Sequence, residues 1–232
     1  MHEELRQSVC NANIELHKQK LVIYSWGNVS GIDRSAGIVA IKPSGVSYDR
    51  LTADKIVLLD LDGNVVDGSL NPSSDTPTHI ELYRSFKDVG GICHTHSANA
   101  TMWAQACKEI PCFGTTHADH FYGAVPVTKP MKPNEIKNDY ELNTGKVIVK
   151  RFAAGKIDPM QMPAVLVACH GPFTWGKNPD KAVENAVVLE QVAAMASGTI
   201  AINKNQKSIS SVLLDKHYLR KHGKNAYYGQ KS

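Results

Sequence analysis

The sequence predicts a mixed α/β fold built as a single domain over residues 1–232. Short runs rich in β-branched residues alternate with stretches of helical period, and the groups that could carry chemistry gather where strands are expected to end. A chain of 232 residues lies at the upper end of single-domain sizes, and no repeat, low-complexity tract or Pro/Gly/Ser-rich linker divides it. We therefore expect one domain with a substantial core.

The first part of the chain is expected to pass from a helix into strands. Apolar residues recur at helical spacing at Leu5, Val9, Ala12 and Leu16. Residues 38–41 and 56–60 are short apolar runs closed by turn residues, which is typical of strands. The second run continues across Asp62-Gly63 into another apolar pair, so IVLLDLDGNVV predicts a hairpin with a positive-φ turn.

A polar loop then leads into a helix, and the alternation continues. The segment PSSDTPTH marks the helix start at Ser74 or Asp75, with Pro77 in the first turn. The elements expected next are a strand at 90–96, a helix at 98–107, a loop at 114–123 and a short strand at 124–127.

The last part of the chain combines the clearest strand with three expected helices. A weakly periodic stretch at 133–150 favours a helix. Residues 163–168 are the clearest buried strand, and His170 follows at its exit. A long helix from about 180 to 200 and another from about 209 to 222 complete the chain.

Charge and cysteine usage narrow the class of function. The net charge is +4, and the lysines and arginines are scattered, which disfavours nucleic acid and suits a small anionic substrate. Five cysteines without a CxxC pair argue against a disulfide framework and favour a reducing cytoplasm. The N-terminal segment lacks the apolar stretch of a signal peptide, and no run of about 20 uninterrupted apolar residues predicts a membrane span.

Three histidines form a pattern typical of a metal site. His94 and His96 are separated by one residue, so on a strand both side chains would leave the same face and could bind one ion. His170 ends another strand and would supply a third imidazole if the two strands are neighbours. Three nitrogens with a fourth position open favour zinc, although an isolated HxH is more often a pair of ordinary solvated or hydrogen-bonded histidines.

Two polar residues beside this pattern have competing interpretations. Asp75 is either a helix N-cap or a carboxylate at the metal. His79 lies one helical turn further on, and we assign it to a solvated helix face and not to the metal.

Three short loops carry groups that suit phosphate. They are Ser25–Ser30, Lys42–Gly45 and Pro72–Asp75. Small residues in them let backbone N–H groups approach a phosphate, while hydroxyls and Lys42 add donors and charge. Each alone is more often a structural turn. None fits a nucleotide-binding glycine motif, so nucleotide binding is disfavoured.

Taken together, the motifs resemble the class II aldolase/epimerase family. WGNVS, IKPSGV, PSSDTPTH, GGICHTHS, GTTHAD, HGPFTWGK and DKHYLRKHGKNAYYGQ occur in the family's order over almost the whole chain. Within the family they are similar to the branch of L-ribulose-5-phosphate 4-epimerases. The resemblance implies a three-layer fold whose central, largely antiparallel sheet is flanked by helices.

The resemblance also implies a role for each matching residue. The metal ligands would be His94, His96 and His170, with Asp75 at the same ion. The sugar phosphate would be bound by Gly27, Asn28, Lys42, Ser44, Gly45, Ser73 and Ser74. The acid/base pair would be Asp119 and Tyr228. Tyr228, with the substrate-binding His217 and Arg220, would reach the site of a neighbouring subunit, which implies a homotetramer with active sites between subunits.

The implied activity is zinc-dependent epimerisation of L-ribulose 5-phosphate to D-xylulose 5-phosphate. Retro-aldol cleavage of C3–C4 and re-addition to the other face of the aldehyde would invert C4, with zinc stabilising the enediolate. The alternative is an aldolase of the L-fuculose-phosphate type. Aspartate instead of glutamate at position 75 and the intact AYYG tail favour the epimerase. A catalytically silent binding protein of the same fold is a further alternative, and the pentose pathway and native metal stay open.

Overall fold

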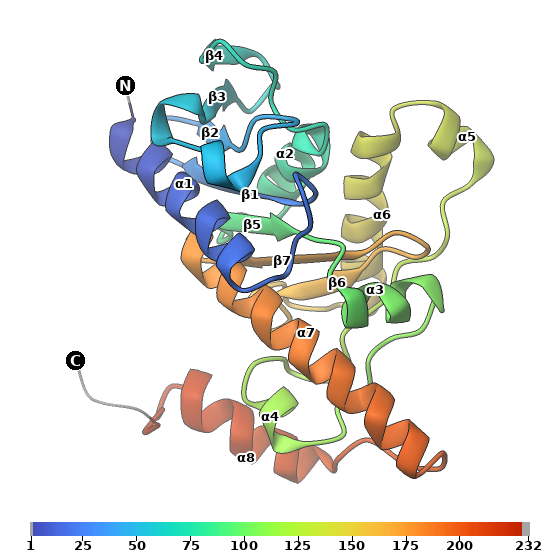
Figure 1. Ribbon diagram of the computed structural model, residues 1–232. Coiled ribbons are helices and arrows are strands. Elements are labelled where there is room, and N and C mark those ends of the chain that lie inside the picture. Colours follow the sequence, from blue (N-terminus) through green and yellow to red (C-terminus); the bar gives the residue numbers. More distant parts are fainter. Residues whose placement is uncertain (1, 229–232) are drawn as a thin grey trace.

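A seven-stranded antiparallel sheet forms the centre of the computed structural model, which describes residues 2–228 (Figure 1). The strands are β1 (Asn28–Asp33), β2 (Ile38–Ile41), β3 (Val57–Asp60), β4 (Val65–Asp67), β5 (Gly91–His94), β6 (Ala164–Leu166) and β7 (Pro172–Gly176). Their order across the sheet is β4-β3-β2-β1-β5-β7-β6, and every pair of neighbours is antiparallel. The expected central antiparallel sheet is therefore confirmed.

Helices cover both faces of the sheet. They are α1 (Glu3–Lys18), α2 (Thr76–Ser85), α3 (Ala98–Gln105), α4 (Thr115–Ala118), α5 (Pro133–Lys137), α6 (Tyr140–Gly155), α7 (Pro179–Ile202) and α8 (Ser211–His222). In Figure 1, α1 and α7 run in front of the sheet, while α2 and α6 lie behind it. The expected mixed α/β fold in three layers is confirmed as well.

Alternation along β5 decides which side chains reach which layer. Cys93 packs in an apolar cluster with Ala12 of α1 and Ala186 of α7. Ile92 packs on the opposite face, in the cluster that contains residues of α2 and α6. Because side chains two apart on a strand share a face, His94 points with Ile92 towards the α2 and α6 side. The register of β5 thus determines where His94 lies.

The expected elements are largely present, with instructive differences at their ends. The hairpin forms as β3 and β4, and Gly63 in its turn has a φ of 89°. The stretch 133–150 is helical but is divided into α5 and α6. The short strand expected at 124–127 is wrong, because Val125 and Val127 make only isolated bridges, to Ile110 and Leu166 respectively.

Two central strands were not expected. β1 begins inside the segment interpreted as a phosphate loop. β7 begins inside HGPFTWGK, between the expected strand at 163–168 and the helix expected from about 180. Asn28 and Ser30 look like turn residues in the sequence, yet Ser30 is fully buried, since its hydroxyl bonds to His79 and Tyr83 of α2. A central strand is difficult to recognise in the sequence when it contains polar residues whose hydrogen-bond partners lie on another element.

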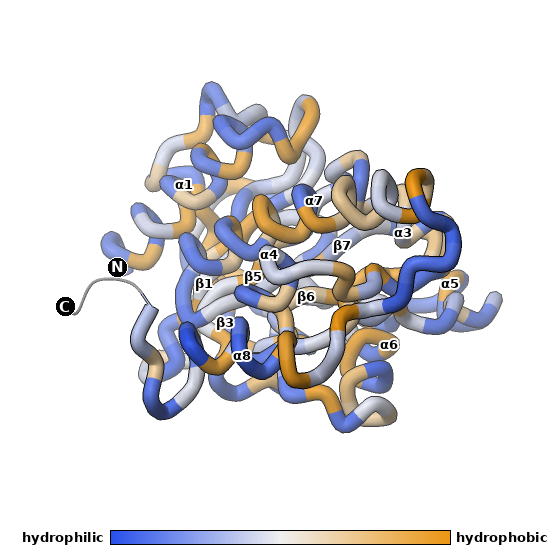
Figure 2. The backbone as a smooth tube through the Cα atoms, turned by 90° about the horizontal axis from the view of Figure 1, so that it is seen from below, coloured by the Kyte–Doolittle hydropathy of each residue, from blue (hydrophilic) through white to orange (hydrophobic). Residues whose placement is uncertain are grey.

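The long helix α7 belongs to the core. Among residues 2–228 it is the one helix with the length and apolar composition of a membrane span. Its N-terminal half packs on β5 and β7, and it also contacts α1 and α3. Figure 2 shows the tube of α7 largely in orange, whereas α8 mixes orange with blue. Burial against the sheet accounts for the apolar residues in the N-terminal half of α7, whereas Met195 and Ile202 near its C-terminal end are exposed.

Candidate metal centre

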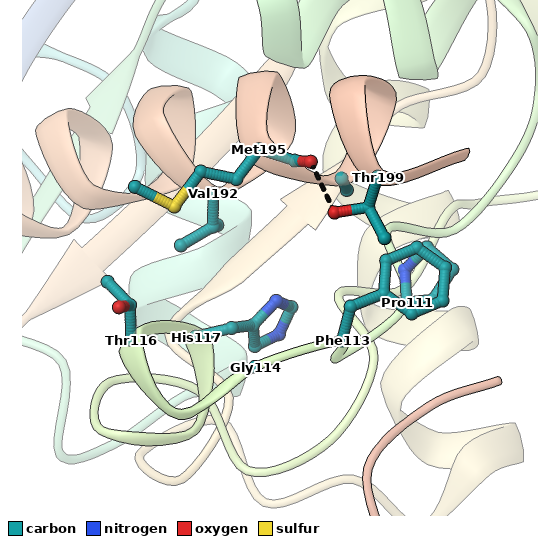
Figure 3. A pocket seen from close by; sticks show the side chains of 9 residues that line it. Pro111, Phe113, Gly114, Thr116, His117, Val192, Met195 and Thr199 are labelled. Atoms are coloured by element: carbon teal, nitrogen blue, oxygen red, sulfur yellow. Dashed lines mark hydrogen bonds between the residues drawn. The ribbon is translucent and has the colours of Figure 1, made fainter. Parts of the chain in front are cut away.

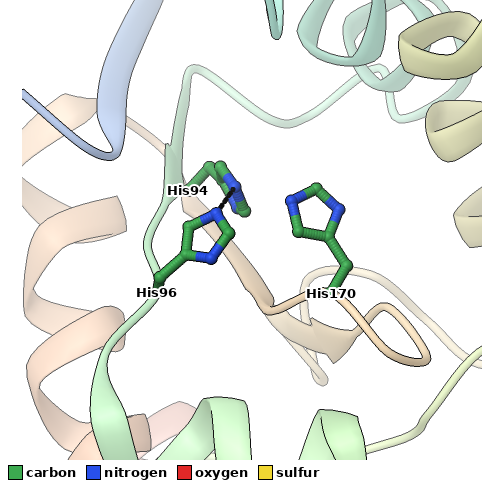
Figure 4. Close-up of side chains that lie close together, drawn as sticks. All are labelled: His94, His96 and His170. Carbon is green, nitrogen blue, oxygen red and sulfur yellow. Dashed lines mark hydrogen bonds between the residues drawn. The ribbon is translucent and has the colours of Figure 1, made fainter.

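Three histidines converge at one end of β5 and β7. His94 is the last residue of β5, His96 follows two residues later, and His170 lies in the turn between β6 and β7. One ligand nitrogen from each lies within 4.8 Å of the others (Figure 4). The strand ends at His94, so the expectation that both histidines of the HTH motif stand on one strand is wrong. The neighbour of β5 is β7 and not β6, so the convergence depends on a strand that we did not expect.

The hydrogen bonds of His94 prepare it to bind a metal. Its Nδ1 donates to the carbonyl of Pro172 at 2.9 Å, which assigns the proton to Nδ1 and leaves Nε2 as an acceptor. Phe173 stacks on the ring with centroids 4.1 Å apart. The Nε2 atoms of His94 and His96 are 3.2 Å apart. Two ligands of a tetrahedral zinc ion, each about 2.0–2.1 Å from the metal, lie about 3.3–3.4 Å apart, so the pair fits a shared ion.

The surroundings of His170 and His96 lower the pKa values of both imidazoles. Burial, together with the nearby His94 and His96, lowers the pKa of His170 to about 3. The pKa of His96 is also lowered by burial and by His94. Metal ligands must be unprotonated, so these side chains are already in the binding form at neutral pH.

Two glycines allow the loops of the centre to approach one another. A Cβ at Gly171 would lie 2.7 Å from the carbonyl oxygen of Thr95, between His94 and His96. Gly27 has a φ of 76°, and a Cβ there would lie 2.8 Å from the carbonyl oxygen of His94. Side chains at either position would push apart the segments that carry the histidines.

Asp75 lies beside the histidines but does not cap its helix. It occupies the N-cap position of α2 without a side-chain capping bond, so the capping alternative is wrong. Its Oδ2 accepts a hydrogen bond from the amide of Asn28 at 2.6 Å. Burial disfavours its charged form, but His94, His79 and the Asn28 amide outweigh that effect and hold the pKa of Asp75 below its ordinary value. The close cluster within residues 2–228 comprises the three histidines alone, so ligation by Asp75 stays a prediction.

The three predicted phosphate loops lie together next to this centre. The amide of Asn28 donates to Ser73 Oγ at 3.0 Å, and the backbone N–H of Ser73 donates to the carbonyl of Lys42 at 3.1 Å. The N–H of Ser44 donates to Asn71 at 2.9 Å in the same pair of loops. The remaining predicted phosphate-binding residues of these segments are Gly27, Gly45 and Ser74.

Lys42 is a buried cation without an anionic partner. Its side chain is 2% exposed, and its Nζ lies 3.3 Å from the carbonyl of Pro43 and 4.9 Å from the ring centroid of Tyr48. Burial lowers the pKa of Lys42 to about 8. Within residues 2–228 no carboxylate forms an ion pair with it. A buried charge of this kind is expected to be neutralised by a ligand, and a phosphate group fits.

The remaining predicted residues form a second group around Asp119. Asp119 follows α4, and its carboxylate lies 2.9 Å from Arg220 and 3.0 Å from His217, both on α8. Burial disfavours its charged form, but the bonds from Arg220 and His217 dominate and lower the pKa of Asp119. The ring of Tyr228 lies 4.8 Å from the guanidinium carbon of Arg220 and 4.5 Å from Nζ of Lys221, and it is 58% exposed.

The second group does not join the histidines within one chain. Figure 1 shows α4 and α8 beneath the sheet, away from the end of β5 that carries His94. A pocket of about 290 Å³ lies between α4 and the C-terminal half of α7, and Figure 3 shows its mainly apolar lining around His117. None of the predicted site residues lines that pocket. The structure thus forms two separate groups, and the roles assigned to their members stay predictions.

Two residues near the centre were missed or misinterpreted. The hydroxyl of Tyr140, the first residue of α6, lies 3.4 Å from Nδ1 of His170. His79 is fully buried and not solvated as expected, because its Nδ1 bonds to Ser30 at 2.7 Å. No spacing in the sequence indicates either contact, since each joins elements that are distant along the chain.

Comparisons with known proteins agree with the fold. Residues 7–197 match the family model described as the class II aldolase and adducin N-terminal domain. A solved L-fuculose 1-phosphate aldolase is similar at 23% identity over 92% of this chain and 94% of its own, with a TM-score of 0.72. YgbL from Klebsiella pneumoniae is similar at 23% identity over 93% of this chain and 99% of its own, with a TM-score of 0.73. That protein is described as a candidate aldolase, epimerase or decarboxylase.

A third solved structure extends the likeness. The L-fuculose 1-phosphate aldolase from Glaciozyma antarctica PI12 is 17% identical over 93% of this chain and 80% of its own, with a TM-score of 0.75. At these identities the solved structures show the fold, while the family model covers most of the chain. On that match, the chain belongs to the class II aldolase and adducin N-terminal domain family.

Proposed function

We propose that this protein interconverts L-ribulose 5-phosphate and D-xylulose 5-phosphate by breaking and remaking the C3–C4 bond. The observation that carries the proposal is a three-histidine cluster beside an aspartate, Asp75, that is already hydrogen bonded to Asn28. An aldolase needs a free base to move a proton to and from the carbon of dihydroxyacetone phosphate. An epimerase moves only hydroxyl protons, so it has no need for such a base at this position.

The three imidazoles are proposed to hold a zinc ion. When bound, a divalent cation at this position would act as a Lewis acid towards negative charge that develops on substrate oxygens. His94, His96 and His170 would leave one position open for the substrate, as in catalytic zinc sites.

The loops beside the centre are proposed to bind the phosphate of the substrate. Lys42 supplies a positive charge that is already removed from water, so little hydration is lost when an anion arrives. Ser44 and Ser73 lie in the two hydrogen-bonded loops on either side of Lys42 and add hydroxyl donors. Anchoring the phosphate there would fix the distance from the substrate's C4 to the histidines.

Asp119 and Tyr228 are proposed to move the proton of the C4 hydroxyl. One group removes this proton as the C3–C4 bond breaks, and the other returns a proton after the aldehyde has rotated. Two groups are needed because the oxygen lies on opposite sides of the aldehyde before and after rotation. Arg220 favours the ionised form of Asp119, while the phenolic O–H of Tyr228 suits the role of proton donor.

A homotetramer is proposed to unite the two groups of residues. Within one chain α4, which Asp119 follows, and α8, against which Tyr228 packs, lie apart from the end of β5 that carries His94, so a catalytic role for both groups requires a second subunit. Closed symmetry would let the α4 and α8 region of each subunit face the histidines of its neighbour. The active sites would then lie between subunits.

An aldolase of the L-fuculose-phosphate type is the second candidate. The observation in its favour is the structural likeness to two proteins named L-fuculose 1-phosphate aldolase. The same metal and phosphate groups would serve both reactions, so the two candidates differ in what leaves the site and not in how the substrate binds.

One assay separates the candidates. Zinc-loaded protein is incubated with L-ribulose 5-phosphate, and in parallel with L-fuculose 1-phosphate, while D-xylulose 5-phosphate and free dihydroxyacetone phosphate are quantified in the same samples. The proposal predicts xylulose phosphate without released triose, and loss of turnover after chelation that zinc restores. Released triose would assign an aldolase, and no turnover with zinc, manganese or cobalt would indicate a catalytically silent binding protein.

A further inference from the structure

Two cysteines lie side by side next to the three histidines. Cys107 follows α3, Cys169 lies in the turn between β6 and β7, and their Sγ atoms are 3.6 Å apart. Cys169 is exposed and Cys107 is partly exposed. The other three cysteines of the chain are buried: Cys10, Cys93 and Cys112. A small oxidant in solution can therefore reach this pair more readily than the others.

The backbone holds the two thiols near one another. The carbonyl of Ala104, in the last turn of α3, accepts hydrogen bonds from the N–H of Cys107 at 3.0 Å and from the N–H of Cys169 at 2.9 Å. This shared acceptor joins the end of α3 to the turn between β6 and β7. The proximity of the thiols is thus set by backbone contacts and does not depend on a side-chain rotamer alone.

Both segments lead directly to candidate metal ligands. Cys169 immediately precedes His170. The helix that ends before Cys107 begins two residues after His96, and its first N–H groups are fixed by bonds from Asn99 and Ala100 to Glu190. A covalent link between the two cysteines would join the segments that carry two of the three imidazoles.

We propose that Cys107 and Cys169 are a redox-sensitive modification site, in which a reversible disulfide weakens metal binding by the three histidines. With hydrogen peroxide as oxidant, one thiolate attacks the peroxide O–O bond and becomes a sulfenic acid, and hydroxide leaves. The second thiolate then displaces hydroxide from that sulfur and forms the S–S bond. Overall, two thiols lose two electrons and two protons, and the peroxide becomes two water molecules.

The geometry explains why the disulfide would disturb the metal. An S–S bond is about 2.05 Å long, so the sulfur atoms must approach by roughly 1.5 Å from their present positions. Metal–ligand distances tolerate changes of only about 0.2 Å. Movement of Cys169 is transmitted to His170 through one peptide link, and the backbone of Cys169, with a φ of 61°, is in the left-handed region where adjustment is restricted. We expect about a tenfold loss of metal affinity, as for disturbed metal-ligand support elsewhere.

The disulfide depends on the two thiols alone, whereas its effect depends on metal binding by the histidines, as proposed above. The test therefore measures the link and the metal without any substrate. Zinc-loaded protein is treated with hydrogen peroxide, its free thiols are blocked, and a peptide map is recorded without reductant. Zinc release is followed in parallel with a chromogenic chelator, before and after dithiothreitol and fresh zinc are added.

The expected result is a peptide that links Cys107 to Cys169, zinc released about tenfold more readily, and recovery after reduction. Cys107→Ser and Cys169→Ser should retain zinc under the same oxidant, whereas Cys112→Ser, the same change at a buried cysteine, should respond as the unmodified protein does. A map without the linked peptide would overturn the proposal, and so would a complete disulfide with unchanged zinc retention. Failure to bind zinc before oxidation would instead contradict the proposed function.

Discussion

The two groups of predicted site residues are built by different forces. The histidines and the loops beside them are held by strand register, backbone hydrogen bonds and a stacked phenylalanine, Phe173. The group around Asp119 is held by ion pairs between a four-residue helix, α4, and the surface of α8. The first arrangement is part of the core, while the second leaves a tyrosine and cations at the surface.

Because of this difference, one chain can form the metal site alone, whereas the proposed acid/base group serves a neighbouring subunit. A metal site requires nitrogens fixed to within a few tenths of an ångström, and the sheet provides that precision. An acid/base group that serves a neighbouring subunit must instead be presented outward, as Tyr228 is. Changes to the histidines should therefore affect the metal, whereas changes to Asp119 or Tyr228 should affect turnover alone.

The largest effect is expected from His170→Ala. Removing one of three imidazoles should abolish stoichiometric zinc binding and lower turnover about 10³-fold or more, because several kcal/mol of charge stabilisation are lost. Metal content by mass spectrometry and the assay with ribulose phosphate would measure both. His2→Ala makes the same change far from the metal centre and is the matched control. A His170→Ala variant that kept full metal content and activity would contradict the metal assignment.

Asp119→Asn and Tyr228→Phe should lower turnover without removing the metal. Loss of a group that transfers a proton costs about 10²–10⁴-fold. Tyr227→Phe changes the adjacent tyrosine in the same way and should be neutral. If either catalytic variant lost zinc in proportion to activity, the separation between the two regions would fail.

A smaller effect is expected from pH through Lys42. Its pKa is about 8, so the protein without ligand loses this positive charge as pH rises above 8, and affinity for the phosphate of the substrate should fall. The KM should rise up to tenfold per pH unit above pH 8 while kcat changes little. Lys42→Met should raise KM at neutral pH and remove this pH dependence, and an unchanged profile in that variant would place the titration elsewhere.

The smallest change is expected from Ser30→Ala, in the stability of the fold. The mutation leaves His79 and the hydroxyl of Tyr83 without their buried partner, at a cost of about 1–3 kcal/mol in the free energy of unfolding. Urea denaturation measures this loss. Ser208→Ala, at an exposed serine, should not change the stability. Equal stabilities of the two variants would show that the buried hydrogen bonds of Ser30 contribute nothing.

Sequence patterns were sufficient to predict an element where the local pattern of residues matches the burial of that element in the fold. The helical spacing near Leu5 and Leu16 predicts α1, the Asp62-Gly63 turn predicts the hairpin, and the apolar run before His170 predicts β6. These features need little information from distant parts of the chain. The convergence of the three histidines was also expected, but it depends on β7, a strand that the sequence patterns do not predict.

The remaining features could not be predicted, because their partners are far away in sequence. Ser30 is recognisable as a buried strand residue only once His79 and Tyr83 are placed over it. Tyr140 reaches His170 across 30 residues, and the Asp119 carboxylate meets Arg220 across 101 residues. Family resemblance pointed to Asp119 and Arg220, but their direct pairing within one chain appears only in the structure.

The most direct test of a shared active site mixes two inactive subunits. His170→Asn, which lacks the metal, and Tyr228→Phe, which lacks the proton donor, are co-expressed with different tags, and the mixed oligomer is purified through both. In a closed symmetric oligomer whose sites combine histidines from one subunit with Tyr228 from the next, about a quarter of the sites contain both intact groups. We predict epimerase activity near that fraction of the unmodified protein. A mixed oligomer that is as inactive as either variant alone would contradict the account.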